Sequence, residues 1–165
     1  MMKKLIATVG FLAAFVCMAA EKSPFTLALQ AYTFKDRTMV ETIEVAKRLG
    51  FSAIELTPVQ KLGGTFTGTC THAGMSPETR AAVRAYLANC GVKALSYGVV
   101  NAPDEAGWRK QFEFARDLGI GMILTEPPPG QLPLIDRLAQ EYKICVHIHN
   151  HARTNPWWDP AFMAA

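Results

Sequence analysis

Three of the four histidines of this chain fall within five residues, at His147, His149 and His151. If the run 144–151 is a β-strand, its side chains alternate between two faces, so the three imidazoles share one face and the apolar residues between them share the other. Imidazoles spaced two apart can converge on a metal ion or a polar substrate, and imidazole suits Zn, Mn, Fe, Co or Ni. The spacing therefore favours a site over three separate structural histidines.

Polar residues recur where the other strand-like runs end. The candidates are Tyr32, Thr33, Glu55, Tyr97, Glu126 and the run 149–151. In parallel α/β barrels the carboxyl ends of the strands meet at one face, and this face carries the chemistry. We therefore expect these residues to lie near one another.

The segments that would position these residues alternate between strand and helix. Strands are expected at 25–34, 51–57, 93–100, 122–125 and 144–151. Helices are expected at 38–49, 76–90, 104–118 and 132–142. Start and stop signals support the helices: Thr38 is followed three residues later by Glu41, Ser76 precedes Pro77, and Gly50 closes the first helix. The connection 58–75 is long and rich in glycine and threonine, and long connections often carry function.

Regular alternation of strands and helices indicates a parallel sheet with crossover helices. An open doubly wound sheet and a closed eightfold barrel begin identically. No Gly-x-Gly-x-x-Gly sequence follows the first strand, which weakens a dinucleotide-binding interpretation. Because polar residues gather at the strand ends, the sequence predicts an α/β fold, a partial (β/α)8 TIM barrel with about five parallel strands and four to five helices.

Composition sets the outer bounds. The chain has 165 residues, of which 50% are hydrophobic and 19% charged, as in ordinary globular proteins with one core. The formal net charge is +3, and no run rich in lysine or arginine follows Lys3-Lys4. The sequence therefore predicts a small-molecule ligand and no nucleic-acid partner.

Residues 1–20 have the layout of a secretory signal peptide. A basic start is followed by an uncharged run from Leu5 to Val16 and by small residues at Ala19 and Ala20. The run is shorter than the ~20 apolar residues of a spanning helix, so no stable membrane span is expected. We expect export to the periplasm or secretion, with a mature domain over 21–165.

Three segments resemble the xylose-isomerase-like TIM barrel superfamily, specifically the exported branch of sugar phosphate isomerase/epimerase-like proteins. They are 50–56, 93–100, and 147–151 together with Trp158-Asp159-Pro160. In many members of that family the fifth strand ends in Glu-Asn-His, and its Glu binds a divalent metal that holds and polarises sugar oxygens. Here the tripeptide is His149-Asn150-His151, so the resemblance implies that His149 is the metal ligand. Imidazole in place of carboxylate removes a negative charge, which favours Zn, Mn or Co over Mg.

The resemblance implies a metal-dependent sugar isomerase or epimerase that moves a proton next to a sugar carbonyl. Glu55 and His151 are the expected catalytic residues, and Tyr32, Glu126 and Asn150 are expected to bind the substrate. Two alternatives stay open: a metal-dependent hydrolase or lyase of the same superfamily, and a non-catalytic carbohydrate-binding remnant.

A complete barrel of this kind has ~250 residues and eight strand-helix units. The 165 residues here supply about five strands. In the family, the remaining metal ligands, an Asp, a His and a Glu, come from later strands. We therefore expect an incomplete barrel domain, truncated after the fifth strand or completed by a second chain, either in a homo-oligomer or as a missing C-terminal half.

Overall fold

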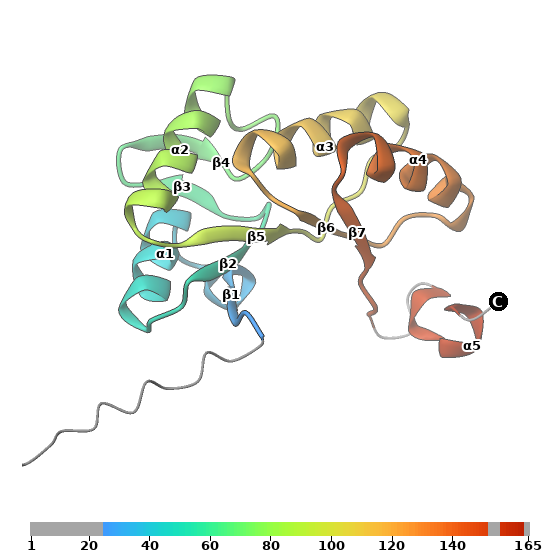
Figure 1. Cartoon of the computed structure of the whole chain (residues 1–165), viewed down its shortest axis with the longest axis horizontal. Helices are drawn as coiled ribbons and strands as arrows, with labels where there is room; N and C mark the ends of the chain where they lie inside the picture. The colour runs from blue at the N-terminus through green and yellow to red at the C-terminus, as the bar shows by residue number, and fades with distance from the viewer. Residues whose placement is uncertain (1–24, 152–155, 164–165) are drawn as a thin grey trace, which may run out of the picture.

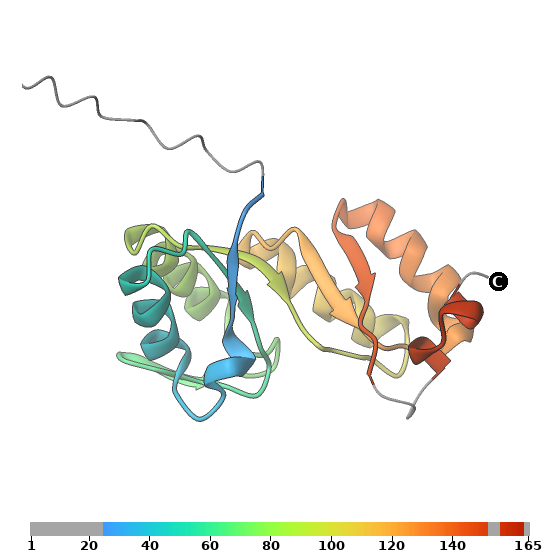
Figure 2. The same cartoon turned by 90° about the horizontal axis from the view of Figure 1, so that it is seen from below.

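The computed structural model describes residues 25–151 and 156–163; the expected signal peptide lies outside them. Five strands form one sheet: β1 (Ala28–Gln30), β2 (Ala53–Leu56), β5 (Lys93–Tyr97), β6 (Met122–Thr125) and β7 (Cys145–Ile148). All four neighbouring pairs are parallel, in the order β1-β2-β5-β6-β7. Figure 2 shows β1 and β7 at opposite ends of this sheet.

The main helices follow these strands in turn. They are α1 (Met39–Arg48), α2 (Pro77–Asn89), α3 (Glu105–Leu118) and α4 (Leu132–Tyr142), and a short α5 (Pro160–Met163) comes last. Figure 1 shows α1 to α4 following one another along one side of the sheet. A doubly wound sheet would carry helices on both faces, whereas strands in chain order with helices outside them are the arrangement of a barrel. The prediction of a partial barrel is confirmed.

The helix signals of the sequence act as expected. Thr38 accepts a hydrogen bond from the Glu41 backbone, and the Glu41 carboxylate accepts one from the Thr38 backbone, which makes a complete capping box. Ser76 caps α2 with Pro77 in its first turn. Gly119 ends α3 in the left-handed conformation that glycine adopts at low cost.

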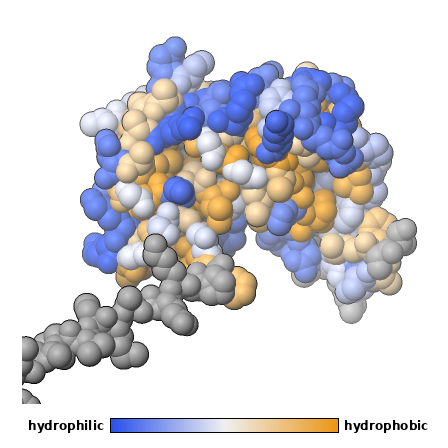
Figure 3. Space-filling view, in the orientation of Figure 1, coloured by the Kyte–Doolittle hydropathy of each residue, from blue (hydrophilic) through white to orange (hydrophobic). Residues whose placement is uncertain are grey.

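The core lies between the helices and the sheet. Trp108, Phe112 and Phe114 of α3 are fully buried, as are Ile54 of β2 and Ile123 of β6. Figure 3 shows hydrophilic residues gathered over the helices along the upper rim and apolar residues below them. The outer face of the sheet therefore packs against the helices, and polar side chains can lie on the opposite face.

Two segments differ from the prediction. The expected strand 25–34 is a strand only over Ala28–Gln30, and the next four residues, Ala31–Phe34, form a 3-10 helix that carries Tyr32. The expected loop 58–75 contains an antiparallel hairpin, β3 (Lys61–Gly63) with β4 (Phe66–Thr69). The glycine and threonine content of that segment indicated a long connection, but it did not indicate the strand pairing within it.

Two further 3-10 helices, Pro129–Gln131 and Pro156–Trp158, complete the described elements. Among the residues that the structure describes, none of the helices combines the length and the apolar character needed to cross a lipid bilayer.

Candidate functional site

A polar layer lies across the first three strands of the sheet. The register pairs Gln30 with Glu55 and Glu55 with Ser96, so their side chains share one face. Gln30 Nε2 donates to one oxygen of the Glu55 carboxylate at 3.0 Å, and Ser96 Oγ donates to the other at 2.8 Å. Two donors from the flanking strands thus hold the carboxylate of the middle strand in one orientation.

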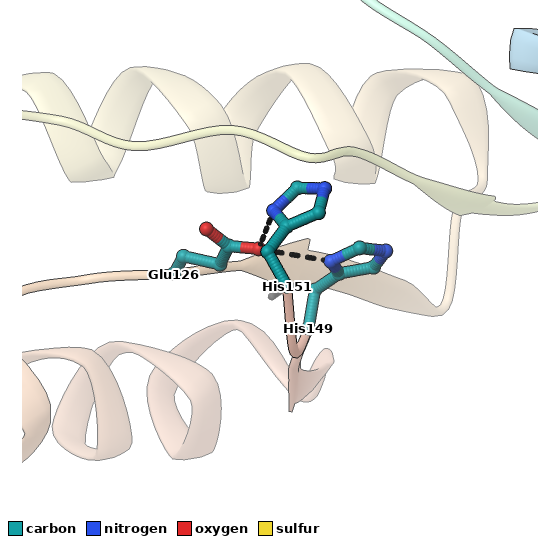
Figure 4. A group of neighbouring side chains, drawn as sticks. All are labelled: Glu126, His149 and His151. Atoms are coloured by element: carbon teal, nitrogen blue, oxygen red, sulfur yellow. Dashed lines mark hydrogen bonds and ion pairs between the residues drawn. The ribbon is translucent and has the colours of Figure 1, made fainter. Parts of the chain in front are cut away.

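A second polar group lies where β6 and β7 end (Figure 4). His149 Nδ1 is 2.9 Å from Glu126 Oε1, and His151 Nδ1 contacts the same oxygen. The Glu126 side chain is 14% exposed, His149 is 27% exposed and His151 is 57% exposed. Two imidazoles therefore converge on one largely buried carboxylate.

Backbone contacts position this group. The His149 backbone N–H donates to the Thr125 carbonyl at 2.9 Å, which continues the β6–β7 ladder by one bond beyond the strand. The Asn101 amide lies 2.8 Å from Thr125 Oγ1, and with its nitrogen turned toward the strand it also donates to the Glu126 carbonyl at 3.1 Å. Trp157 is buried and its Nε1 donates to the Pro127 carbonyl at 2.9 Å. The backbone on both sides of Glu126 is thereby fixed.

The two polar groups share one cavity of about 200 Å³. Its walls are formed by Gln30, Tyr32, Glu55, Thr57, Pro58, Val59, Gly98, Val99, His149 and His151. Gly98 is required here because a Cβ at this position would lie 2.6 Å from the Leu124 carbonyl oxygen, closer than any side chain tolerates. The close approach of β5 to β6 therefore depends on glycine, and the cavity lies between the Glu55 carboxylate and the two imidazoles.

The structure brings most of the predicted site residues together. Glu55, His149 and His151 line the cavity, and Glu126 lies directly behind the imidazoles. Tyr32 lines the cavity from the 3-10 helix after β1, and half of its side-chain surface is exposed.

Two residues of the histidine run lie elsewhere. Asn150 is exposed and is not among the cavity residues. His147 is exposed and borders a separate cavity beside α4, so the prediction that all three imidazoles converge is wrong. His147 lies within β7, which ends at Ile148, whereas His149 and His151 lie beyond the end of the strand, where both contact Glu126.

Several residues that position the site were not predicted from the sequence. Gln30 and Ser96 hold Glu55, and Asn101 holds the strand end that carries Glu126. Gln60 is fully buried, and its Nε2 donates to the Phe34 carbonyl and to Thr42 Oγ1, both at 2.9 Å. This contact anchors the 3-10 helix of Tyr32. A usable signal for Gln30 was that it is a polar residue within the otherwise apolar run of the predicted strand 25–34.

The residues around Glu126 fit a divalent metal. The ligand atoms of Glu126, His149 and His151 all lie within 4.8 Å of one another. A four-coordinate zinc ion with ligands at about 2.0–2.2 Å places its donor atoms roughly 3.3–3.6 Å apart. Two imidazoles and one carboxylate are also a donor set of catalytic zinc sites, which keep one position open. By contrast, burial raises the pKa of the Cys70 thiol to about 12, so this cysteine supplies no thiolate at neutral pH.

Comparison with known proteins is consistent with this architecture. No family model matches the chain, and no curated protein matches it. Among solved structures, the chain is similar to an uncharacterised protein from Parabacteroides distasonis ATCC 8503, with a TM-score of 0.73 and 30% identity over 77% of this chain and 53% of that chain.

Two further solved structures are similar to the chain. One is a sugar phosphate isomerase/epimerase from the same bacterium, with a TM-score of 0.59 and 13% identity over 86% of this chain and 60% of that chain. The other is a xylose isomerase domain protein from Planctomyces limnophilus, with a TM-score of 0.49 and 12% identity over 79% of this chain and 54% of that chain.

The chain thus spans little more than half the length of these structures. The resemblance inferred from the sequence is confirmed for the fold. Over its described strands, the chain has the fold of part of a TIM barrel, as in the sugar phosphate isomerase/epimerase structure to which it is similar.

Proposed function

We propose that this chain carries part of a metal-dependent sugar isomerase or epimerase site. The observation that supports this proposal is the convergence of Glu126, His149 and His151 on one point at the carboxyl end of the sheet, across a cavity from Glu55. The fold adds support because barrels of this kind carry their chemistry at that end.

In this proposal His149, His151 and Glu126 hold the metal. Their nitrogen and oxygen donors favour Zn, Mn or Co over Mg, which prefers an all-oxygen shell. A bound divalent cation would polarise a sugar carbonyl or hydroxyl oxygen and so ease removal of a proton from the neighbouring carbon. The role of His151 therefore shifts from the catalytic residue expected from the sequence to a ligand.

Glu55 is the proposed general base. Its carboxylate lines the cavity opposite the imidazoles, and Gln30 and Ser96 fix its orientation. A base held in one orientation loses little entropy when it meets the substrate proton. In isomerisation the proton taken from one carbon is returned by the same carboxylic acid to the neighbouring carbon, on the same face of the sugar. Epimerisation needs a second proton donor on the opposite face of the carbon.

The first test is metal binding by the full chain. Zinc affinity of His149→Ala should fall at least about 100-fold, because loss of even an outer partner of a metal ligand costs 10- to 100-fold. His147→Ala is the matched control, since it removes an imidazole from the same strand but outside the group, and its affinity should equal that of the wild type. Equal zinc affinity in His149→Ala and wild type would contradict the proposed ligand set.

The second test is proton exchange. Aldoses and ketoses incubated with the zinc-loaded chain in D2O should take up deuterium next to the carbonyl, measured by NMR. Glu55→Gln and His149→Ala should both abolish this uptake, whereas His147→Ala should retain it. Absence of uptake with every sugar tested would overturn the proposed activity, whatever the result for metal binding.

A further inference from the structure

We infer that the cavity between Glu55 and the imidazoles binds an uncharged sugar or polyol in preference to the corresponding sugar phosphate. This inference rests on the proposed function only in taking the ligand to be a sugar. It concerns the part of the pocket that this chain itself supplies.

The first argument is the charge of the cavity wall. Among the described residues that line it, the ionisable side chains are Tyr32, Glu55, His149 and His151, and none is a lysine or an arginine. Recognition of phosphate usually uses arginine, lysine or exposed backbone N–H groups at a helix start. The Glu55 carboxylate would instead repel a phosphate dianion placed beside it.

The second argument is the hydrogen bonding of Glu55. Gln30 and Ser96 each donate one hydrogen bond to the carboxylate, one to each oxygen. Each carboxylate oxygen has two acceptor sites, so each can still accept from a ligand hydroxyl in the cavity. A carboxylate with both oxygens held in place recognises a pair of neighbouring sugar hydroxyls, whereas a phosphate dianion has no proton to donate to it.

The third argument concerns the nearest cations. Lys35, Arg37 and Lys61 line a different cavity on the far side of Val59, together with Asp36 and Glu41. The Lys35 ammonium lies over the Tyr32 ring, 5.1 Å from its centroid.

The start of α1 in that second cavity is also closed to anions. The Glu41 carboxylate already accepts from the Thr38 backbone N–H at 2.7 Å, and the pKa of Glu41 is lowered by this hydrogen bond. Two carboxylates thus lie among the three basic residues of the second cavity, and the start of α1 there is already capped.

The volume agrees with this ligand class. About 200 Å³ has room for one monosaccharide. A phosphate group attached to it and turned toward Glu55 would meet the carboxylate, and Tyr32 lies at the rim. An aromatic ring at a rim suits the apolar face of an uncharged sugar better than a dianion.

The experiment compares matched pairs: D-glucose with D-glucose 6-phosphate, and D-xylose with D-xylose 5-phosphate. Each is titrated into the ¹⁵N-labelled full chain at pH 7.5, once in EDTA and once with zinc, and affinities are read from amide shifts. In EDTA the neutral member of each pair should bind about 10-fold more tightly, the order expected for one unfavourable charge contact near a protein surface.

Three variants test whether the Glu55 charge causes the preference for the neutral sugar. Glu55→Gln keeps the shape of the side chain and removes its charge. The affinities for the neutral sugar and for its phosphate should then differ by less than about 2-fold. Glu113→Gln, which removes a carboxylate from α3, should leave the preference unchanged. Lys61→Gln should also leave it unchanged, because the second cavity takes no part; circular dichroism checks that each variant is folded.

Tighter binding of either phosphate than of its neutral partner, an unchanged preference in Glu55→Gln, or binding of neither sugar in either buffer would overturn the inference. Loss of phosphate binding in Lys61→Gln would overturn it as well, because it would place a phosphate at the second cavity. The predicted preference without any deuterium uptake would refute the proposed activity and leave this inference standing. The two proposals therefore fail by different measurements.

Discussion

At the scale of single residues, one carboxylate, that of Glu126, contacts both imidazoles of the site. Both His149 and His151 turn Nδ1 toward Glu126 Oε1, and the carboxylate is the most buried member of the group. A partly buried carboxylate between two imidazoles keeps both rings in one orientation. Glu126 is therefore the residue whose charge matters most for holding a cation.

This arrangement predicts the effect of Glu126→Gln. The amide keeps the shape of the side chain but removes its charge, so zinc affinity should fall about 10- to 100-fold. Competition with a chromophoric chelator measures the affinity, and Glu113→Gln is the control. Wild-type affinity in Glu126→Gln would show that the carboxylate is not a ligand.

The position of a site residue can be predicted from the sequence when it lies in a strand or directly after one, but not when it lies in the irregular backbone beyond. Glu55 and Glu126 were found because each lies at the end of a strand with clear periodicity, and parallel strand ends meet. The convergence of His149 and His151 without His147 was not predictable, because it depends on β7 ending at Ile148 and on the irregular backbone that follows. Alternation along a strand says nothing about side chains beyond its last residue.

At the scale of elements, α1 and α2 are joined on the outside of the sheet by a pair of polar side chains. The Tyr86 hydroxyl donates to the Glu44 carboxylate at 2.8 Å. This hydrogen bond lowers the pKa of Glu44, while burial followed by the same hydrogen bond raises the pKa of Tyr86. The contact therefore favours ionised Glu44 in the folded chain.

The contact predicts a dependence of stability on pH. Because the folded pKa of Glu44 lies below its ordinary value of 4.5, its contribution is fully present above that value and is lost as pH falls through the folded pKa. Tyr86→Phe should return the pKa of Glu44 toward 4.5, as measured by carboxyl ¹³C NMR, and should reduce the acid-induced loss of stability. Tyr32→Phe, a tyrosine away from both helices, should change neither quantity; an unmoved Glu44 pKa in Tyr86→Phe would contradict the assignment.

The helices were the most predictable elements. Their starts carry Thr38, Ser76 and Asp104, whose side chains satisfy the free N–H groups of the first turn. The hairpin of β3 and β4 was missed because its strands are only three and four residues long and carry no regular alternation. The 3-10 helix of Tyr32 was missed because its four apolar and hydroxyl residues fit a strand equally well, and the contact that bends it comes from Gln60, far along the chain.

At the scale of the whole molecule, the sheet is open. Among the described strands, β1 and β7 each have one neighbour, so each has backbone groups that no other described strand pairs. A cavity of about 700 Å³ lies beside β7 and α4, and apolar residues such as Leu132, Ile135 and Val146 contribute to its wall. At the other end of the sheet, Phe25 and Leu27 are more than two thirds exposed.

Open edges of this kind predict self-association of the chain. In sedimentation velocity under reducing conditions, the weight-average mass should rise above that of a monomer over about 10–200 µM, because exposed apolar edges associate in this range. Cys145→Lys places a charge on an exposed position of β7 and should shift the chain toward monomer. A monomer at every concentration would show that the edges are protected.

The order of the elements has one more consequence. The three proposed metal ligands, Glu126, His149 and His151, come from one consecutive stretch of the chain, from the end of β6 through α4 to the residues after β7, which is fewer than thirty residues. Glu55, on the opposite wall of the cavity, comes from a separate unit. Under the proposed function, substitutions in that opposite wall can alter the choice of sugar without changing a metal ligand.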